Sequence, residues 1–252
     1  MRHELNFSKK DFIVVLVCVV ILFINVGAIG SGGRKKAKEI VCLSNVKHLA
    51  DAWLIYTDDN DGLLVGASTR NEYYRWQDWV WSPSMIGGST IEHKKQGIRK
   101  GALFPYVGNV NVYHCPADTR TSIPDQQAFR SYSIADSMNG EIEMSWWYEP
   151  AIKYSQIRKP AAKYVFVEEA DARGWNIGSW LMNPIKPSWV DPLALWHNCK
   201  TTLGFADGHL QMKKWSDWST IEMSESHQFN FETPAEGEDI RFMARGYMCR
   251  NE

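Results

Sequence analysis

Residues 12–29 read FIVVLVCVVILFINVGAI, an uncharged run of eighteen residues whose only amide is Asn25. An apolar stretch of this length is typical of a helix that crosses a membrane, which needs about 20 residues. Residues 27–30, at the end of this run, are a poor cleavage site, and basic residues come soon after them. A cleaved secretory signal peptide is therefore the weaker interpretation. The sequence predicts a membrane-spanning helix near the N-terminus.

A second helical pattern follows the glycine-rich residues 30–33, where we expect a kink or a loosened turn. Apolar residues recur there at three- and four-residue steps and share one face of a helix: Cys42, Val46, Leu49, Trp53 and Tyr56. The pattern ends at Asp58-Asp59-Asn60-Asp61-Gly62, a strong turn signal. We therefore predict a stalk helix of roughly 45 residues, or about 70 Å. The acidic turn also leaves a calcium site open, although it lacks the EF-hand spacing.

The remainder of the chain has the pattern of short strands and turns. Strands are predicted at residues 130–134, 164–168 and 202–206, and the last of these leads into a hairpin through Asp207-Gly208. Residues 172–196 are expected to form an ordered loop, and residues 219–252 a loosely packed C-terminal extension. The predicted fold class is α+β, with the long helix packed on an antiparallel sheet in a head that spans residues 59–218.

Composition narrows the classes of function. A net charge of −1 provides no long-range electrostatic attraction for nucleic acid, so no nucleic-acid partner is expected. Twelve tryptophans supply abundant apolar surface, and residues 73–81 are especially aromatic. That stretch could stack on a sugar or fill the interior of the head. Five cysteines are present, and an oxidising compartment would allow disulfides among those outside the apolar run.

The start of the chain carries a recognisable pattern. Residues 7–15, FSKKDFIVV, resemble the processing signature of type IV prepilins and pseudopilins. The resemblance implies a leader at residues 1–6, a methylated mature N-terminus at Phe7 and an assembly role for Asp11. Asn6 stands where this family has glycine, and Lys9 and Lys10 stand where it has apolar residues. The resemblance also implies a single-pass inner-membrane protein with a cytoplasmic N-terminus and a periplasmic head. Residues 7–30 would then lie in the membrane, and residues 31–58 would form the amphipathic half of the stalk.

Later motifs resemble a prepilin-processing-associated family of pseudopilin-like proteins. His197 is followed after nine residues by Asp207-Gly208, the spacing for which that C-terminal motif is named. Further matching stretches are residues 42–47, 103–106, 115–118 and 205–209. The resemblance runs from Phe7 to about Trp215 and indicates a family more specifically than an activity.

Three hypotheses concern the polar residues of the head. His197 could act as a general base that Asp207 orients, or His197, Asp207 and Glu168 could bind a divalent metal ion. The third hypothesis makes His197 a structural hydrogen-bonding residue and Asp207 a turn residue. Cys42 and Cys115 are the candidates for a disulfide. No nucleophile motif of an α/β-hydrolase is present, and we expect no catalytic residue and no dedicated cofactor.

The sequence therefore predicts a structural pseudopilin-like subunit of a type II secretion or type IV pilus-like assembly. Other pilin-like subunits are its expected partners through the N-terminal helix, with a prepilin peptidase as the processing enzyme. The alternative is an unprocessed, membrane-anchored protein of the bacterial cell envelope whose tryptophan-rich head binds polysaccharide.

Overall fold

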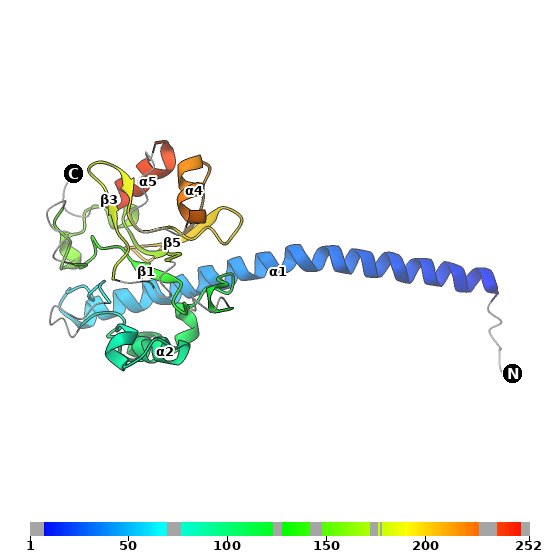
Figure 1. Ribbon diagram of the computed structural model, residues 1–252, viewed down its shortest axis with the longest axis horizontal. Helices are drawn as coiled ribbons and strands as arrows, with labels where there is room; N and C mark the ends of the chain where they lie inside the picture. The colour runs from blue at the N-terminus through cyan, green and yellow to red at the C-terminus, as the bar shows by residue number, and fades with distance from the viewer. Residues whose placement is uncertain are drawn as a thin grey trace.

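The computed structural model describes residues 8–69, 77–122, 128–141, 148–171, 176, 178–226 and 236–247, without the side chains of residues 23–29 and 31. Its dominant element is helix α1, Lys9–Asp59, which projects far beyond the rest of the chain (Figure 1). Ser8 caps its start, and Asp61 and Gly62 adopt positive φ angles of 53° and 76° just after its end. The stalk helix and its acidic stop signal were thus predicted well. The helix is continuous through residues 30–33, so the expected kink is absent.

A four-stranded antiparallel sheet forms the centre of the head. Its strand order is β1-β2-β5-β6, with bounds Tyr132–Ile134, Tyr164–Glu168, Lys200–Phe205 and Leu210–Lys214. The β5–β6 hairpin turns at Asp207-Gly208, where Gly208 has a φ of 86°. A separate antiparallel pair joins β3, Met182–Asn183, to β4, Ser188–Trp189. The prediction of an α+β fold with an antiparallel sheet is confirmed.

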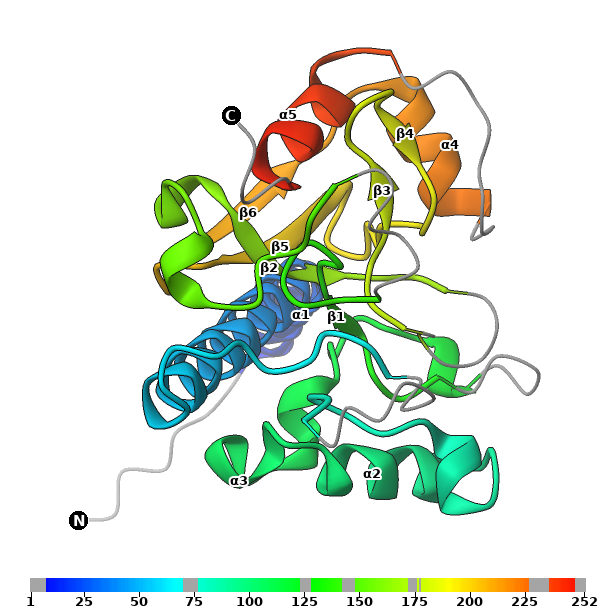
Figure 2. The same cartoon turned by 90° about the vertical axis from the view of Figure 1, so that its left-hand side faces the viewer.

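Helix α1 lies between this sheet and a layer of short helices (Figure 2). That layer contains α2, Ile91–Lys100, and α3, Phe104–Val107. Neither helix was predicted, since we expected strands and turns after residue 63. The 3₁₀ helices are η1 Pro83–Ile86, η2 Val110–Tyr113, η3 Arg120–Ser122, η5 Tyr154–Gln156 and η6 Pro160–Ala162.

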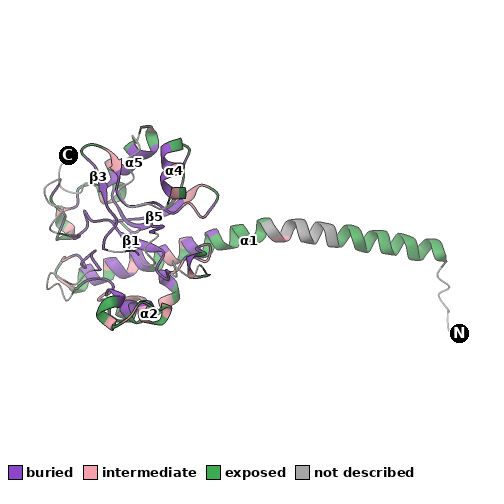
Figure 3. Ribbon diagram, viewed as in Figure 1, coloured by how far each residue is buried: buried purple, intermediate pink, exposed green. Residues whose placement is uncertain are grey.

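The predicted apolar stripe of α1 is the centre of the larger hydrophobic core. Its five residues, from Cys42 to Tyr56, are each at most 4 % exposed. They pack against residues of the sheet and of the α2–α3 layer, including Phe166 and Leu103. Both sides of this part of the helix are therefore covered by the head, whereas residues 9–22, nearer the N-terminus, are exposed (Figure 3).

The C-terminal region packs more tightly than expected. Helix α4, Trp218–Ser226, and helix α5, Glu238–Tyr247, cover the sheet face opposite α1 and contribute Met223, Met243 and Tyr247 to a second core. Each of these three side chains is fully buried. The prediction of a loosely packed extension was wrong for the described part of residues 219–252, because two helices of nine and ten residues were too short to be recognised by their period.

The membrane prediction also requires correction. Among the residues that the structure describes, no helix combines the length and apolarity that a membrane crossing requires. The predictions of a membrane-spanning stalk half at residues 7–30 and of a single-pass inner-membrane location are therefore overturned.

Candidate metal centre

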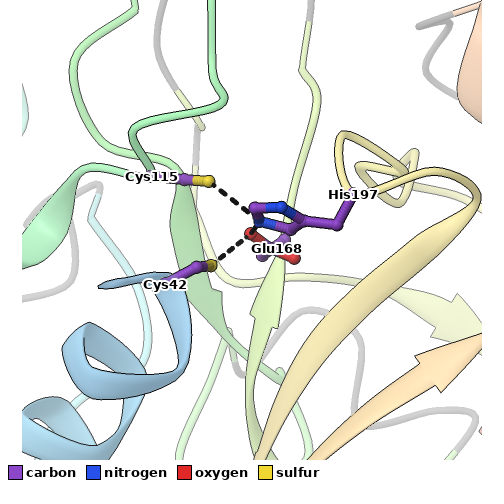
Figure 4. Close-up of side chains that lie close together, drawn as sticks. All are labelled: Cys42, Cys115, Glu168 and His197. Carbon is purple, nitrogen blue, oxygen red and sulfur yellow. Dashed lines mark hydrogen bonds and ion pairs between the residues drawn. The ribbon is translucent and has the colours of Figure 1, made fainter. Parts of the chain in front are cut away.

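Four side chains with metal-binding chemistry meet in the interior of the protein, where α1 packs against the head. Cys42 comes from α1, Cys115 from the loop after η2, Glu168 from the end of β2 and His197 from the loop before β5 (Figure 4). One ligand atom from each residue lies within 4.8 Å of those from the other three. All four residues are buried, His197 the least so at 4 % exposed. The cluster joins the stalk helix to three separate segments of the head.

Local structure explains how these residues converge. Cys42 occupies the start of the apolar stripe, and β2 is buried along its whole length, so Glu168 emerges inside the core. Asn198 and Cys199 both adopt the left-handed conformation, with φ angles of 57° and 56°. This tight reversal brings the chain into β5 and leaves His197 directed at the sheet (Figure 4).

The contacts within the cluster are short and direct. The Cys42 thiol donates to Glu168 Oε1 at 2.7 Å. His197 Nε2 lies 3.2 Å from Cys115 Sγ and 3.3 Å from the same Glu168 oxygen. The histidine nitrogen therefore faces both a sulfur and a carboxylate.

Additional donors surround the two sulfurs and the carboxylate. The Tyr132 hydroxyl lies 3.2 Å from Cys42 Sγ, and the Thr202 hydroxyl donates to that sulfur at 3.4 Å. The backbone N–H of Ala117 donates to Cys115 Sγ at 3.4 Å, and that of Thr202 donates to Glu168 Oε2 at 2.7 Å. Such donors stabilise negative charge on the atoms that they contact.

The environment raises the pKa values of Cys42 and His197 and lowers that of Cys115. Burial raises the pKa of the Cys42 thiol well above its ordinary value, and nearby Cys115 and Glu168 raise it further. Burial also opposes ionisation of Cys115, but its hydrogen bonds with Cys42 and His197 prevail and lower its pKa. Burial alone would lower the pKa of His197, yet its contacts with Cys115 and Glu168 raise it to about 10. The contacts with Cys115 and Glu168 therefore favour the charged form of the imidazole, and the hydrogen bonds with Cys42 and His197 favour the thiolate of Cys115.

This geometry differs from that of a cysteine hydrolase. In a catalytic triad, the nucleophile and the orienting carboxylate bind opposite nitrogens of the histidine ring. Here Cys115 and Glu168 both approach Nε2 of His197. The sulfur is also fully buried, so a substrate has no access to it.

The structure brings together only part of the predicted set. Glu168 and His197 meet as the metal hypothesis required, but Asp207 lies outside the cluster, in the β5–β6 turn. There its carboxylate accepts the backbone N–H of His209 at 3.1 Å and also contacts the imidazole of His209. Asp207 and Gly208 thus act as turn residues, and the proposed orientation of His197 by Asp207 was wrong.

The two cysteines of the cluster were proposed as a disulfide pair. They do approach each other, but both are free thiols in this structure. Of the processing residues, Asn6 and Phe7 lie outside the described residues. Asp11 caps its own helix by accepting the Ser8 backbone N–H at 2.9 Å.

The aromatic residues provide little surface for a sugar. In the predicted stacking stretch, Trp79 is fully buried, and Tyr73, Tyr74 and Trp76 lie outside the described residues. Five tryptophans are at most 1 % exposed: Trp53, Trp79, Trp180, Trp189 and Trp215. Among the tryptophans that the structure describes, Trp218 is the prominent exception, at 71 % exposed.

Comparison with known proteins does not extend these observations. The chain matches no family model, no curated protein and no solved structure. Its function must therefore be argued from its own geometry.

Proposed function

We propose that this protein is a pilin-like structural subunit that assembles with further copies through the outer segment of α1, residues 12–22. The observation that carries the proposal is the exposure of this segment. Ten of its eleven side chains are large and apolar, and each of those ten is 40–68 % exposed. Complete burial of one such side chain is worth about 1.5–3 kcal/mol. A surface of this kind is stable in water only when something covers it.

The pattern of exposure favours several neighbours rather than one. Successive residues of an α-helix point about 100° apart, so a continuous run such as residues 12–17 is apolar on every side. A single partner would cover one stripe only. A bundle of parallel copies covers all sides, with each helix surrounded by the same segment of its neighbours.

Charge at the start of the helix is consistent with such a bundle. Lys9, Lys10 and Asp11 precede the apolar segment, and all three are exposed. In a staggered parallel arrangement, Asp11 of one copy can approach a lysine of the next, which would set the register. The resemblance of residues 7–15 to the prepilin signature supports the same role.

The head remains attached to the other half of the helix. Its larger core encloses the α1 stripe, and Lys200 donates to Glu39 at 2.9 Å just outside that core. One helix thus has two functions: the outer segment makes contacts between copies, and the inner part carries a rigid head.

Charging the outer segment is expected to abolish assembly. Leu16 and Val20 are 54 % and 48 % exposed and lie one turn apart on the same face. In the double variant Leu16→Glu, Val20→Glu, two carboxylates would have to be buried between helices, which is strongly unfavourable. Sedimentation velocity should show oligomers for the wild-type full-length chain and monomers for the variant.

A matched control places the same charges elsewhere on the helix. Val41 and Ile55 are 46 % and 52 % exposed but lie beside the head. The double variant Val41→Glu, Ile55→Glu should therefore assemble like wild type. Equal oligomer distributions for all three proteins, or a monomeric wild type, would contradict the proposal.

A further inference from the structure

We propose that Cys42, Cys115, Glu168 and His197 form a closed, four-coordinate site for a zinc ion that joins the stalk helix to the head. Two thiolates, one imidazole and one carboxylate are a donor set that zinc accepts in proteins. Thiolate ligands disfavour calcium and magnesium, which prefer oxygen donors. The possible calcium site at the acidic turn, residues 58–62, is therefore separate from this cluster.

The spacing of the ligand atoms matches a small tetrahedral site. Zinc lies about 2.3 Å from sulfur and about 2.0–2.2 Å from nitrogen or oxygen, so neighbouring ligand atoms are about 3.3–3.8 Å apart. The distances from His197 Nε2 to Cys115 Sγ and Glu168 Oε1, 3.2 and 3.3 Å, are close to that range. The Cys42 Sγ to Glu168 Oε1 distance of 2.7 Å would widen by about 1 Å. Cys42 and Glu168 would therefore have to move apart when the ion binds.

The surroundings of the cluster also suit bound metal. Tyr132, Thr202 and the Ala117 backbone already direct hydrogen-bond donors at the sulfurs, as the outer shell of a metal–thiolate site does. The Thr202 backbone holds the second oxygen of Glu168, which leaves Oε1 for the ion. These donors already lie beside the proposed ligand side chains.

A zinc ion would offset most of the negative charge of its ligands. Two thiolates and one carboxylate carry three negative charges, and Zn²⁺ with neutral His197 leaves a net charge of −1. A pocket of about 570 Å³ adjoins His197 and is lined mainly by basic residues, among them Lys35, Lys38 and Lys200, together with Glu39. Of the four proposed ligands, His197 is the one that lines this pocket.

The number of protein ligands indicates a structural role. Catalytic zinc sites keep one position for water or substrate, whereas structural sites use four protein ligands. The four residues come from α1 and from three head segments, up to 155 positions apart in the chain (197 − 42). The ion would therefore join elements that lie far apart in the sequence.

The inference is tested on the full-length protein, purified with reductant and equilibrated with zinc chloride. Elemental analysis should find one zinc per chain, and cobalt(II) in its place should give the absorption of a tetrahedral thiolate site. The single variants Cys42→Ser, Cys115→Ser and His197→Gln should each bind zinc at least about 100-fold more weakly, because the loss of outer-shell contacts alone costs about 10–100-fold. Thr202→Val, which removes one donor to Cys42, should cost about tenfold.

Cys199→Ser is the matched control, since Cys199 lies two residues from His197 but outside the cluster. It should bind zinc like wild type. Because a ligand variant can also fail to fold, the wild-type cobalt spectrum provides an independent readout. A folded, fully reduced wild type that binds no zinc, or equal zinc affinity in Cys115→Ser and Cys199→Ser, would overturn the proposal. So would a cobalt spectrum without thiolate bands.

Discussion

Replacing Trp53 by alanine is expected to lower the free energy of unfolding by about 3–5 kcal/mol, the usual cost of removing a large aromatic side chain from a core. Trp53 belongs to the α1 stripe and is fully buried, and its ring centroid lies 6.1 Å from that of Tyr154. No other residue of α1 places as large a side chain in the core that joins helix and head. Urea unfolding, followed by circular dichroism, measures the effect.

Two further substitutions make this prediction specific. The indole N–H of Trp53 has no hydrogen-bond partner among the described residues, so Trp53→Phe loses volume but no polar contact and should cost much less than Trp53→Ala. Ile55, two residues along the helix, is 52 % exposed, and Ile55→Ala should change stability by less than about 0.5 kcal/mol. Equal losses for Trp53→Ala and Ile55→Ala would show that the head does not depend on this face of the helix.

Zinc is expected to stabilise the native protein strongly. An ion that binds only the folded state adds about 2.7 kcal/mol when its free concentration is 100 times the dissociation constant, and about 4.1 kcal/mol at 1,000 times. The four ligands come from distant parts of the chain, so the unfolded protein has no preformed site. Urea midpoints in zinc buffers should therefore rise steadily with free zinc and fall when a chelator is added.

The dependence of the urea midpoint on zinc should disappear when one of the ligand residues is replaced. Cys115→Ser should show one midpoint at all zinc concentrations, and Cys199→Ser should follow wild type. Calcium at the same concentrations should have no effect through this cluster, because its thiolates are poor calcium ligands. A wild-type midpoint that does not respond to zinc would mean that the buried cluster is stable as a hydrogen-bonded group alone.

Periodic sequence signals predicted the parts of the fold that they specify directly. The α1 stripe recurs every three or four residues, and all of its members are buried. Strand β2 begins and ends at the predicted residues 164 and 168. Helix α2 was missed because its buried residues, Lys94, Gly97 and Ile98, include only one large apolar side chain. Helices α4 and α5 were missed because each has only about three turns.

The candidate site was predicted in two unconnected parts. Glu168 and His197 were proposed as metal ligands, and Cys42 and Cys115 as a disulfide. Each pair was a sound expectation from residue type, but only the tertiary fold brings α1 beside the end of β2. Asp207 was assigned to the site because of its motif spacing, whereas the hairpin directs its carboxylate to His209. Sequence distance carries no information about such contacts.

The prediction of a membrane-spanning helix was also wrong. It depended on the length of the apolar run from residue 12 to residue 29, and the described structure contains no helix that satisfies the requirement for a membrane crossing. The exposed apolar side chains of residues 12–22 still need to be covered. In the present proposal, further copies of the same helix provide that cover.

The central claim, that copies of this chain meet through the outer segment of α1, can be tested with a native residue. Cys18 lies within that segment and is exposed, whereas Cys42 and Cys115 are buried. A short thiol-specific bifunctional maleimide, added to the full-length Cys199→Ser, Cys249→Ser protein, should link two chains through Cys18. The linked dimer should be absent from the Cys18→Ser derivative and from the Leu16→Glu, Val20→Glu derivative. If the dimer is missing with Cys18 present, or forms equally well without it, the outer segments do not meet and the proposed assembly is wrong.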